Sequence, residues 1–446
     1  MKRISFVFVF LSILFAFFSC EKEKDKTNIY LSQNEIEFDY EENYADFKMS
    51  NIGSEDFTWA ASTESDFIFF TESSGLCKKN SFVEIGVNLN RSEITGDSIS
   101  TSINISTDNG DDRTIEVLVL NYPEEKIRLG FQVYDAQYDY KNDQLVMIPN
   151  YYPNIVAIFD LSTLQIHQVE IEEDPRHITI LPAGGIAVVS YQNGQFGMAA
   201  TINTVTKKLI DTFSNDNVYY SDIIGAPENL VYFFPNYSND KLGLLNIITG
   251  DFNYLNNGFN IANAKLHPTG KYIYACDYSR LTKLNIENQL PVEEYSTYQY
   301  DTDGAVWISK DGDYIFTRSK QILKIEPEME GIDIVESETL LLDRSYLHYI
   351  EQNEVKNEYY IIPSNYSYSP GSQCDQIYIF GQNFNFKSTI DLEDYMYKIN
   401  NSPGYQTSPP SAEYVFCSSD GNQIIVVTKG TVTYASDSWG IEIINR

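Results

Sequence analysis

The larger, carboxyl-terminal part of the chain, residues 123–446, repeats itself about every 42 residues. Each unit opens with an apolar segment, passes through a tight turn and continues into an aromatic-rich segment. One residue of each turn aligns with its counterparts: Asp143, Gly184, Glu228, Gly270, Gly312, Asn357 and Gly421. The steps between them are 41, 44, 42, 42, 45 and 64 residues, and the last step carries an insertion around Tyr395 to Pro410. A unit of this length holds about four short strands and cannot bury both of its faces alone, so the units must stack.

The segments that follow the turns also match one another, at residues 144–148, 186–190, 230–234, 272–276, 314–317, 359–362 and 424–428. Four-stranded units with this period are typical of a β-propeller, and seven turns predict seven blades. Six or eight blades stay open, because the unit near residues 345–390 is irregular. The chain ends on a third strand at 441–444, so we expect strand 129–134 to supply the fourth strand of that blade and close the ring.

The best-preserved unit is Ala264-Lys-Leu-His-Pro-Thr-Gly-Lys-Tyr-Ile-Tyr274. It resembles the bacterial propellers of the YVTN and surface-layer type. The chain has no Trp-Asp repeat signature, so the WD-repeat family is not indicated.

Residues 28–122 alternate apolar and polar side chains in short runs, for example at 45–49, 101–105 and 114–119. Turn sequences such as Asp108-Asn109-Gly110 separate the runs, and Trp59 is the natural core aromatic. This pattern predicts a two-sheet β-sandwich. The fold class is therefore all-β: an immunoglobulin-like β-sandwich at 28–122 followed by a seven-bladed β-propeller at 123–446.

Short motifs of residues 28–122 resemble the BACON family of Bacteroidota immunoglobulin-like domains. They are Asn51-Ile52-Gly53 leading to Phe57-Thr58-Trp59, then Gly75, Asn90-Arg91 before Gly96, and Thr107-Asp108-Asn109-Gly110. The family is often described as carbohydrate-associated, but the sequence contains no exposed aromatic triplet that demands a sugar. We therefore expect a spacer that lifts the next domain.

The amino-terminal sequence predicts where in the cell the protein is located. Residues 1–19 have a basic start and an apolar stretch too short to span a bilayer comfortably, as in a secretory signal peptide. Phe17-Phe18-Ser19-Cys20 resembles a bacterial lipobox, which implies lipidation of Cys20 and attachment to a membrane. The charged tether 20–27 resembles the surface-export signal of Bacteroidota lipoproteins, which implies the outer face of the outer membrane. A periplasm-facing lipoprotein and a transmembrane anchor are the alternatives.

The chain is strongly acidic, with 31 Lys+Arg against 63 Asp+Glu and a net charge of −32. Removal of Lys2 and Arg3 with the leader leaves 29 − 63 = −34. Such a chain repels phosphate backbones, so we expect no nucleic-acid partner. Cys276 and Cys417 are expected in the core, and Cys374 is expected in a polar loop where it could form a disulfide. The spacings of these three cysteines and Cys77 fit no disulfide framework and no metal-binding pattern.

No catalytic signature is present, and we expect no cofactor and no metal site; an enzyme is less favoured than a binding protein. Aligning the repeats on their turns places Ala136, His177, Asp222, Asn263, Ala305 and Tyr414 at one level of the innermost strands. Polar and aromatic groups at a channel mouth suit a glycan, because hydroxyl groups take hydrogen bonds and sugar faces stack on rings. The alternatives are an envelope-protein interaction platform and a polysaccharide hydrolase or lyase. The candidate ligand-binding residues are Arg176, His177, Tyr220, Asp222, Asn263, Asp303, Tyr346, His348 and Tyr414.

Overall fold

A computed structural model describes residues 29–39, 42–94, 98–120, 126–150, 154–193, 196–216, 220–235, 241–255, 261–329, 331–365, 374–398, 405–430 and 439–446. The expected leader, Cys20 and the tether lie outside these residues. The chain divides into two compact units, residues 1–124 and 125–446, where the sequence predicted a boundary at 122/123. Among the described residues, no helix is long and apolar enough to cross a membrane.

In the part of unit 1 (residues 1–124) that the structure describes, two sheets share one core. One sheet has the strand order β1-β3-β7-β5 and the other β2-β9-β8-β4-β6, with β2 parallel to β9. The bounds are β1 Ile29–Leu31, β2 Glu35–Phe38, β3 Tyr44–Asn51, β4 Phe57–Ser62, β5 Ile68–Phe70, β6 Ser74–Cys77, β7 Phe82–Leu89, β8 Ser98–Thr107 and β9 Arg113–Leu120; the 3₁₀ turn Arg91–Glu93 follows β7.

The core of unit 1 follows from the alternation in its sequence. In β4 every second side chain is buried, and Trp59 on this strand is 3% exposed. Gly75 on the paired strand β6 leaves room for the indole, because a Cβ atom there would lie 3.1 Å from Trp59 Nε1. The prediction that Trp59 is a core residue is confirmed.

Unit 2, residues 125–446, contains seven four-stranded antiparallel sheets and a two-stranded one among its described residues. The first six sheets use consecutive strands and are named in chain order, innermost strand first. Sheet 1 is β11 Gln132–Asp139, β12 Gln144–Asn150, β13 Ile155–Asp160 and β14 Gln165–Glu170; sheet 2 is β15 Pro175–Ile180, β16 Ile186–Asn193, β17 Phe196–Asn203 and β18 Lys208–Asp216; sheet 3 is β19 Tyr220–Ala226, β20 Leu230–Pro235, β21 Leu242–Asn246 and β22 Phe252–Leu255, with the 3₁₀ turn Pro227–Asn229.

Sheets 4 to 6 continue the pattern, and sheet 7 completes it. Sheet 4 is β23 Asn263–Leu266, β24 Tyr272–Cys276, β25 Leu281–Asn285 and β26 Val292–Thr297; sheet 5 is β27 Val306–Ile308, β28 Tyr314–Thr317, β29 Gln321–Ile325 and β30 Ile334–Thr339; sheet 6 is β31 Tyr346–Asn353, β32 Glu358–Ser364, β33 Gln376–Gly381 and β34 Phe386–Asp391; sheet 7 is β37 Pro410–Cys417, β38 Gln423–Gly430, β39 Trp439–Asn445 and β10 Lys126–Arg128. The two-stranded sheet pairs β35 Tyr395–Lys398 with β36 Tyr405–Ser408.

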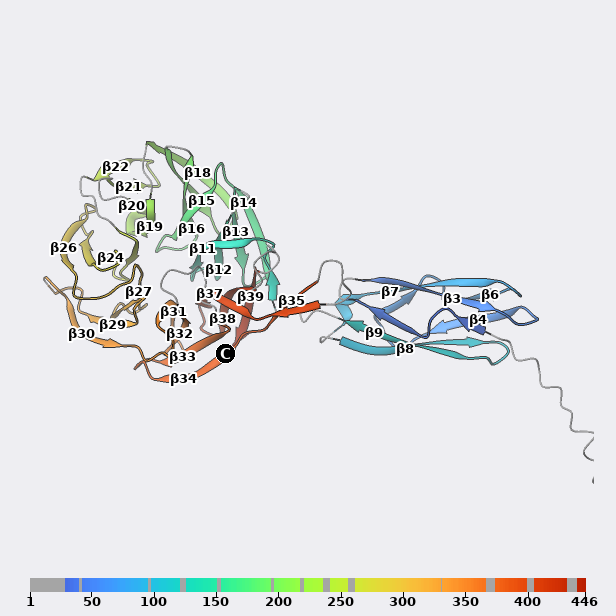
Figure 1. Ribbon diagram of the computed structural model, residues 1–446. Helices are drawn as coiled ribbons and strands as arrows, with labels where there is room; N and C mark the ends of the chain where they lie inside the picture. Colours follow the sequence, from blue (N-terminus) through green and yellow to red (C-terminus); the bar gives the residue numbers. More distant parts are fainter. Residues whose placement is uncertain are drawn as a thin grey trace, which may run out of the picture. The chain divides into compact units, whose positions relative to one another are not determined.

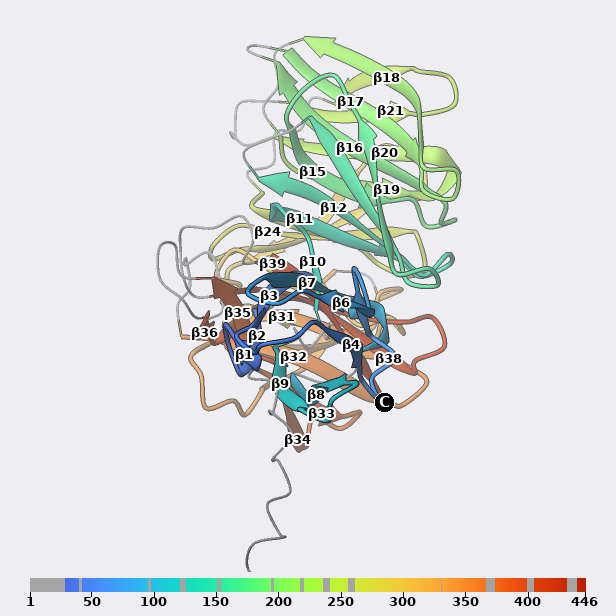
Figure 2. The ribbon, with the colours of Figure 1, turned by 90° about the vertical axis from the view of Figure 1, so that its right-hand side faces the viewer.

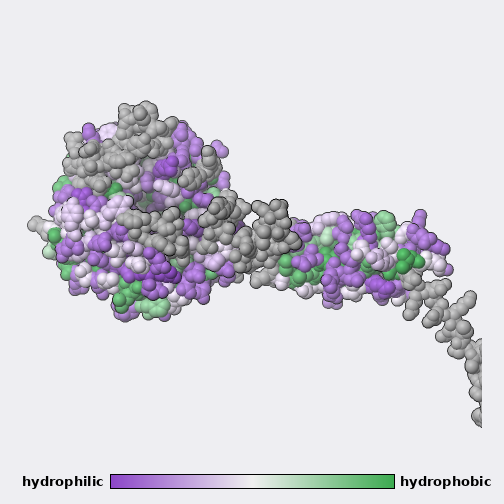
Figure 3. All heavy atoms as spheres, viewed as in Figure 1, coloured by the Kyte–Doolittle hydropathy of each residue, from purple (hydrophilic) through white to green (hydrophobic). Residues whose placement is uncertain are grey.

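The sheets of unit 2 lie side by side around a common axis (Figures 1 and 2). Innermost strands of neighbouring sheets contact each other from β11 through β15, β19 and β23 to β27, and again between β31 and β37. The middle strands β13, β20 and β24 are buried over their whole length, because they are covered by sheets on both faces. Polar side chains cover most of the described surface of unit 2 on the face seen in Figure 3.

The ring is closed by β10, which pairs with β39 through Lys126–Glu442, Ile127–Ile441 and Arg128–Gly440. The expected closing strand, 129–134, is therefore placed too late. Residues 132–134 belong instead to β11, the innermost strand of sheet 1, and Leu129 adds one more backbone bond to Trp439. The apolar pattern indicated the correct region of the chain for the closing strand. A strand with only three paired residues is too short for such a pattern to give its exact bounds.

All four cysteines among the described residues, Cys77, Cys276, Cys374 and Cys417, are buried free thiols. Cys374 was expected in a polar loop with a pairing option. It is instead 2% exposed and packs in the core between sheets 6 and 7.

Candidate ligand site at the axis of unit 2

Five of the seven innermost strands carry a β-bulge at the same level. The register shifts lie between Val133 and Asp135, Pro175 and His177, Tyr220 and Asp222, Leu347 and Tyr349, and Ala412 and Tyr414. The residues inserted at these shifts, called the bulge residues below, are Tyr134, Arg176, Ser221, His348 and Glu413. A bulge redirects side chains and interrupts pairing, which is why bulges are frequent beside binding sites.

The residue after each bulge belongs to a ring around the axis. Asp135 on β11 is within electrostatic reach of His177 on β15, Asp222 on β19 and Lys265 on β23. It also contributes to the raised pKa values of Tyr349 on β31 and Tyr414 on β37. One carboxyl group can influence strands of five other sheets only from the interior of the ring.

Side chains of this ring tie neighbouring sheets together. Asp135 accepts a hydrogen bond from the backbone N–H of Ile178 at 3.1 Å. Asp222 accepts one from Ala264 N–H at 2.8 Å, and Asn263 accepts one from Val306 N–H at 3.1 Å. Asn263 Nδ2 also donates to Asp222 at 3.2 Å. Two of the predicted ligand-binding residues, Asp222 and Asn263, are therefore engaged in joining sheets 3, 4 and 5.

Burial raises the pKa of Asp135 to about 6, with a further contribution from the negative charge of Asp222. His177, Lys265 and the Ile178 N–H oppose the shift. The interior of the ring thus disfavours an additional negative charge.

A second set of residues, the mouth arc, lies on sheets 6, 7, 1 and 2 and consists mainly of bulge residues. His348 Nε2 is 3.4 Å from Glu413 Oε2, and Lys429 Nζ is 3.0 Å from Glu413 Oε1. Glu413 also accepts a hydrogen bond from Ser411 Oγ. Burial raises the pKa of Glu413, but the interactions with His348 and Lys429 outweigh burial and lower this pKa, so Glu413 is a carboxylate at neutral pH.

The other half of the mouth arc is aromatic and more open. Tyr414 donates its hydroxyl hydrogen bond to the backbone oxygen of Tyr134 at 2.9 Å, and Tyr134 meets the His177 ring edge-on with centroids 6.4 Å apart. Tyr134 is 42% exposed. Arg176, whose side chain is 47% exposed, pairs with Asp174 at 2.9 Å. A flat ring, a guanidinium group and two imidazoles thus gather at the end of the axis where the innermost strands begin.

The structure places the nine predicted residues in three groups. Arg176, His177, His348 and Tyr414 lie in the mouth arc, while Asp222 and Asn263 lie deeper as ties between sheets. Tyr220 packs on Phe233 with centroids 4.9 Å apart, Asp303 lies in the turn before β27 and Tyr346 begins β31, so these three are outside the two clusters.

Sequence reasoning missed Tyr134, Asp135, Tyr349 and Glu413. The alignment used the left-handed residue of each turn as its reference, and Gly184 comes seven positions after His177. The corresponding residue of the first unit, Asp143, comes eight positions after Asp135, so an offset of seven selected Ala136 instead. A repeat alignment on the strands rather than on the turns would have found Asp135. Bulges leave no distinct pattern in a sequence.

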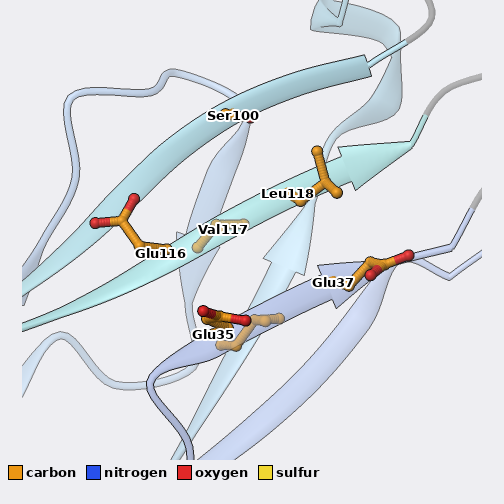
Figure 4. Close-up of a pocket in the computed structure, with 7 residues that line it drawn as sticks. Glu35, Glu37, Ser100, Glu116, Val117 and Leu118 are labelled. Carbon is orange, nitrogen blue, oxygen red and sulfur yellow. The ribbon is translucent and has the colours of Figure 1, made fainter.

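A separate hollow lies on the outer face of unit 1, between β2, β9 and β8, and is lined by Glu35, Glu37, Ser100, Glu116 and apolar neighbours (Figure 4). Three exposed carboxylates repel one another and are not by themselves a site. Within the described ranges, no group of three or more His, Cys, Asp or Glu side chains could hold a metal ion.

No family model matches the chain, and no curated protein matches it. Among solved structures, it is similar to the β-propeller domain of Cps50 (Swd1) from Myceliophteria thermophila, with a TM-score of 0.52 at 10% identity over 72% of this chain and 98% of that one. Hydrazine synthase from Kuenenia stuttgartiensis gives 0.48 at 11% identity over 72% and 97%, and a functionally unknown protein from Desulfotomaculum acetoxidans gives 0.47 at 13% over 69% and 95%. The first of these likenesses shows the fold alone: this all-β chain contains a β-propeller.

Proposed function

We propose that this protein is a lipoprotein, anchored through Cys20 to the outer membrane and facing outward, that binds a neutral oligosaccharide without turning it over. In this proposal residues 28–122 form an immunoglobulin-like, BACON-like spacer, and the seven sheets of unit 2 are seven blades. The ligand lies on the mouth arc, with Tyr134 as a stacking surface and Arg176, His177 and His348 as hydrogen-bonding groups.

The observation that carries the proposal is the internal charge balance of the mouth arc. Arg176 is paired with Asp174, and Glu413 is paired with both His348 and Lys429. A ligand that brought its own charge would have to break one of these pairs. A neutral polyol can instead hydrogen-bond to the paired groups and stack on Tyr134, which is the usual way that proteins bind sugars.

The same groups argue against glycoside hydrolysis. A hydrolase needs one carboxylic acid that is still protonated near neutral pH and a second carboxylate across the bond. Glu413 has a lowered pKa and is held by Lys429 and His348. Asp135 has a raised pKa, but both of its oxygens accept backbone hydrogen bonds, from Ala136 and Ile178. This arrangement supports binding more than catalysis.

The test is a glycan-array screen followed by calorimetry on the wild type, Tyr134→Ala, Arg176→Ala and His348→Ala. We expect loss of the stacking ring to weaken binding by about 1 kcal/mol, roughly fivefold. Phe386→Ala is the matched control, because Phe386 is 56% exposed but lies on the outermost strand β34. Binding that survives all three mouth-arc changes would contradict the site, and formation of product would favour an enzyme instead. Failure to bind any glycan would favour the interaction platform.

The location is tested separately. Cys20→Ala should abolish acylation and leave an uncleaved or soluble form, and protease added to intact cells should degrade the wild type if it faces outward. Normal cleavage with persistent membrane attachment of Cys20→Ala would contradict the lipoprotein proposal.

A further inference from the structure

Four side chains meet at the opposite end of the axis, where the innermost strands finish. Lys310 Nζ lies 2.5 Å from Glu351 Oε1 and 3.3 Å from Cys417 Sγ. Cys417 Sγ is 3.1 Å from the same Glu351 oxygen. Tyr140 donates its hydroxyl to Glu351 Oε2 at 2.8 Å, and its ring lies 3.8 Å from Lys310 Nζ. This cluster, the basal quartet, joins sheets 5, 6, 7 and 1 and takes no part in the proposed function.

The combination of groups in the basal quartet is unusual for a structural ion pair. A salt bridge requires only the amine and the carboxylate, yet here the amine also donates a hydrogen bond to a thiol sulfur, and the thiol donates to the same carboxylate. Cys417 is a free thiol, and the Lys310 amine lies 3.3 Å from its sulfur. An oxidised Cys417 would therefore have a nitrogen nucleophile within contact distance.

We propose that Cys417 and Lys310 form a site of reversible oxidative modification, in which a peroxide converts the contact into a covalent sulfur–nitrogen bond. The thiol is first oxidised by the peroxide to a sulfenic acid, with release of one water. The Lys310 amine then attacks the sulfur, a sulfur–nitrogen bond forms, and the sulfenic hydroxyl leaves as a second water. Sulfenic acids are known to condense with nitrogen in this way. In total, one thiol, one neutral amine and one hydrogen peroxide give one sulfenamide and two waters.

Glu351 supplies the proton transfers that this reaction needs. Its Oε1 atom is placed to take a proton from the Lys310 ammonium group, which makes the amine nucleophilic, and to return that proton to the departing hydroxyl on sulfur. This help is needed because burial, followed by the negative charge of Glu351, raises the pKa of the Cys417 thiol, and the attraction of Glu351 outweighs burial and raises the pKa of Lys310. The reaction at this site is therefore slow unless the Glu351 carboxylate transfers the protons.

Peroxide can reach the cluster although the sulfur itself is buried. Cys417 is 3% exposed, but Tyr140 is 36% exposed and the Lys310 side chain is 25% exposed, so the quartet opens to solvent on the amine side. The new bond would link sheet 5 to sheet 7, the sheet that closes the ring, across sheet 6. The oxidised form should therefore be the more resistant to unfolding.

The experiment treats the full-length protein with hydrogen peroxide, unfolds it in denaturant with iodoacetamide and without reductant, and analyses the digest by mass spectrometry. We expect a Lys310 peptide joined to a Cys417 peptide at the sum of their masses less two hydrogen atoms, and separation of the two by dithiothreitol. The midpoint temperature of unfolding should rise on oxidation. Cys77 is the internal control, since it is fully buried and its sulfur donates hydrogen bonds to the carbonyl oxygens of Met49 and Ser81; it should be recovered alkylated.

Lys310→Arg is the matched variant, because it keeps a cation beside Glu351 and on the Tyr140 ring but has no nucleophilic amine. Its Cys417 should be recovered alkylated or further oxidised, with no linked peptide and no rise in midpoint temperature. Glu351→Gln should form the link more slowly than the wild type. The proposal is overturned if wild-type Cys417 is recovered free or as a sulfinic acid, or if Lys310→Arg gives the same thermal shift as the wild type.

Discussion

Individual residues with left-handed backbone conformations shape the turns that follow the innermost strands. Gly312, in the turn between β27 and β28, has φ +80, and its carbonyl oxygen accepts a hydrogen bond from His267 Nε2–H at 2.9 Å. His267 is 2% exposed, and burial lowers its pKa. The glycine and the neutral imidazole fit together, because the ring occupies the space that a side chain at 312 would need.

Gly312→Ala should therefore lower the free energy of unfolding by more than the penalty for placing an alanine at this left-handed backbone angle. A Cβ atom at 312 would lie 2.6 Å from His267 Nε2, whereas one at Gly331, with φ +78 in the same sheet, would have nothing within 4 Å. We expect Gly331→Ala to cost about 1 kcal/mol, the usual penalty of a left-handed alanine, and Gly312→Ala to cost about 2–4 kcal/mol. Urea unfolding of both variants measures the difference, and equal costs would contradict the steric argument.

Asp135 should make stability depend on pH in an unusual direction. Its pKa rises from 3.8 to about 6 in the folded protein, so between these values the folded state binds more protons than the unfolded state. The free energy of unfolding should then increase as the pH falls from 7 through 6 toward 4. Relative to Asp135→Asn, which cannot titrate, the wild type should gain up to about 3 kcal/mol over this range. Urea unfolding at pH 7, 6, 5 and 4 tests this, and parallel curves for the two proteins would contradict it.

At the scale of strands and sheets, closure of unit 2 depends on the short strand β10. It contributes three paired residues to sheet 7, and its Lys126 forms an ion pair with Glu442 at 3.3 Å in which both side chains are nearly buried. Tyr414 and the Asp143–Ser419 hydrogen bonds add further ties between sheets 7 and 1. Loss of β10 would leave β39 with an open edge and Glu442 buried without its cation.

Two truncated chains distinguish the contribution of β10 to stability from that of the neighbouring residues. A chain that starts at Glu125 keeps β10 and should unfold at the same temperature as unit 2 of the full protein. A chain that starts at Leu129 lacks β10 but keeps all of β11, and it should unfold at a clearly lower temperature and aggregate. Circular dichroism melts and light scattering are the measurements. Indistinguishable behaviour of the two chains would show that closure does not depend on β10.

Much of this arrangement could be predicted from the sequence, because repeated strands bury continuous apolar runs. The segments 186–190 and 272–276 lie in β16 and β24 as expected. What could not be predicted depends on single-residue shifts. The five bulges add one residue each without changing the apolar pattern. The spacing from the bulge to the following turn is also one residue longer in β11 than in β15. Polar residues such as Asp222 and Asn263 also look the same whether they bind a ligand or a neighbouring strand.

At the scale of the whole molecule, each of the two units encloses its own apolar core. Ile103, Ile115 and Trp59 belong to the core of unit 1, and the cores of unit 2 are made of other residues entirely. The three tryptophans divide in the same way, since Trp59 lies in unit 1 while Trp307 and Trp439 lie in unit 2.

The two units should therefore respond separately to a core mutation. Ile103 is fully buried, so Ile103→Ala should destabilise unit 1 by about 2–5 kcal/mol. In calorimetry we expect the transition of unit 1 to move to lower temperature while that of unit 2 stays in place. A variant that keeps only Trp59 reports the first transition by fluorescence, and one that lacks only Trp59 reports the second. Simultaneous movement of both transitions would contradict the division.

The pairing of β10 with β39 also sets an order in time. Residues 126–128 are among the first of unit 2 to be synthesised, and their partners at 440–442 are among the last. Contacts between such distant residues are costly in chain entropy and slow folding. Until the final strand emerges, sheet 7 cannot exist, and a nascent chain has to wait with unpaired edges. Residues 440–442 should thus tolerate deletion as poorly as the core does, because they pair with both β10 and β38.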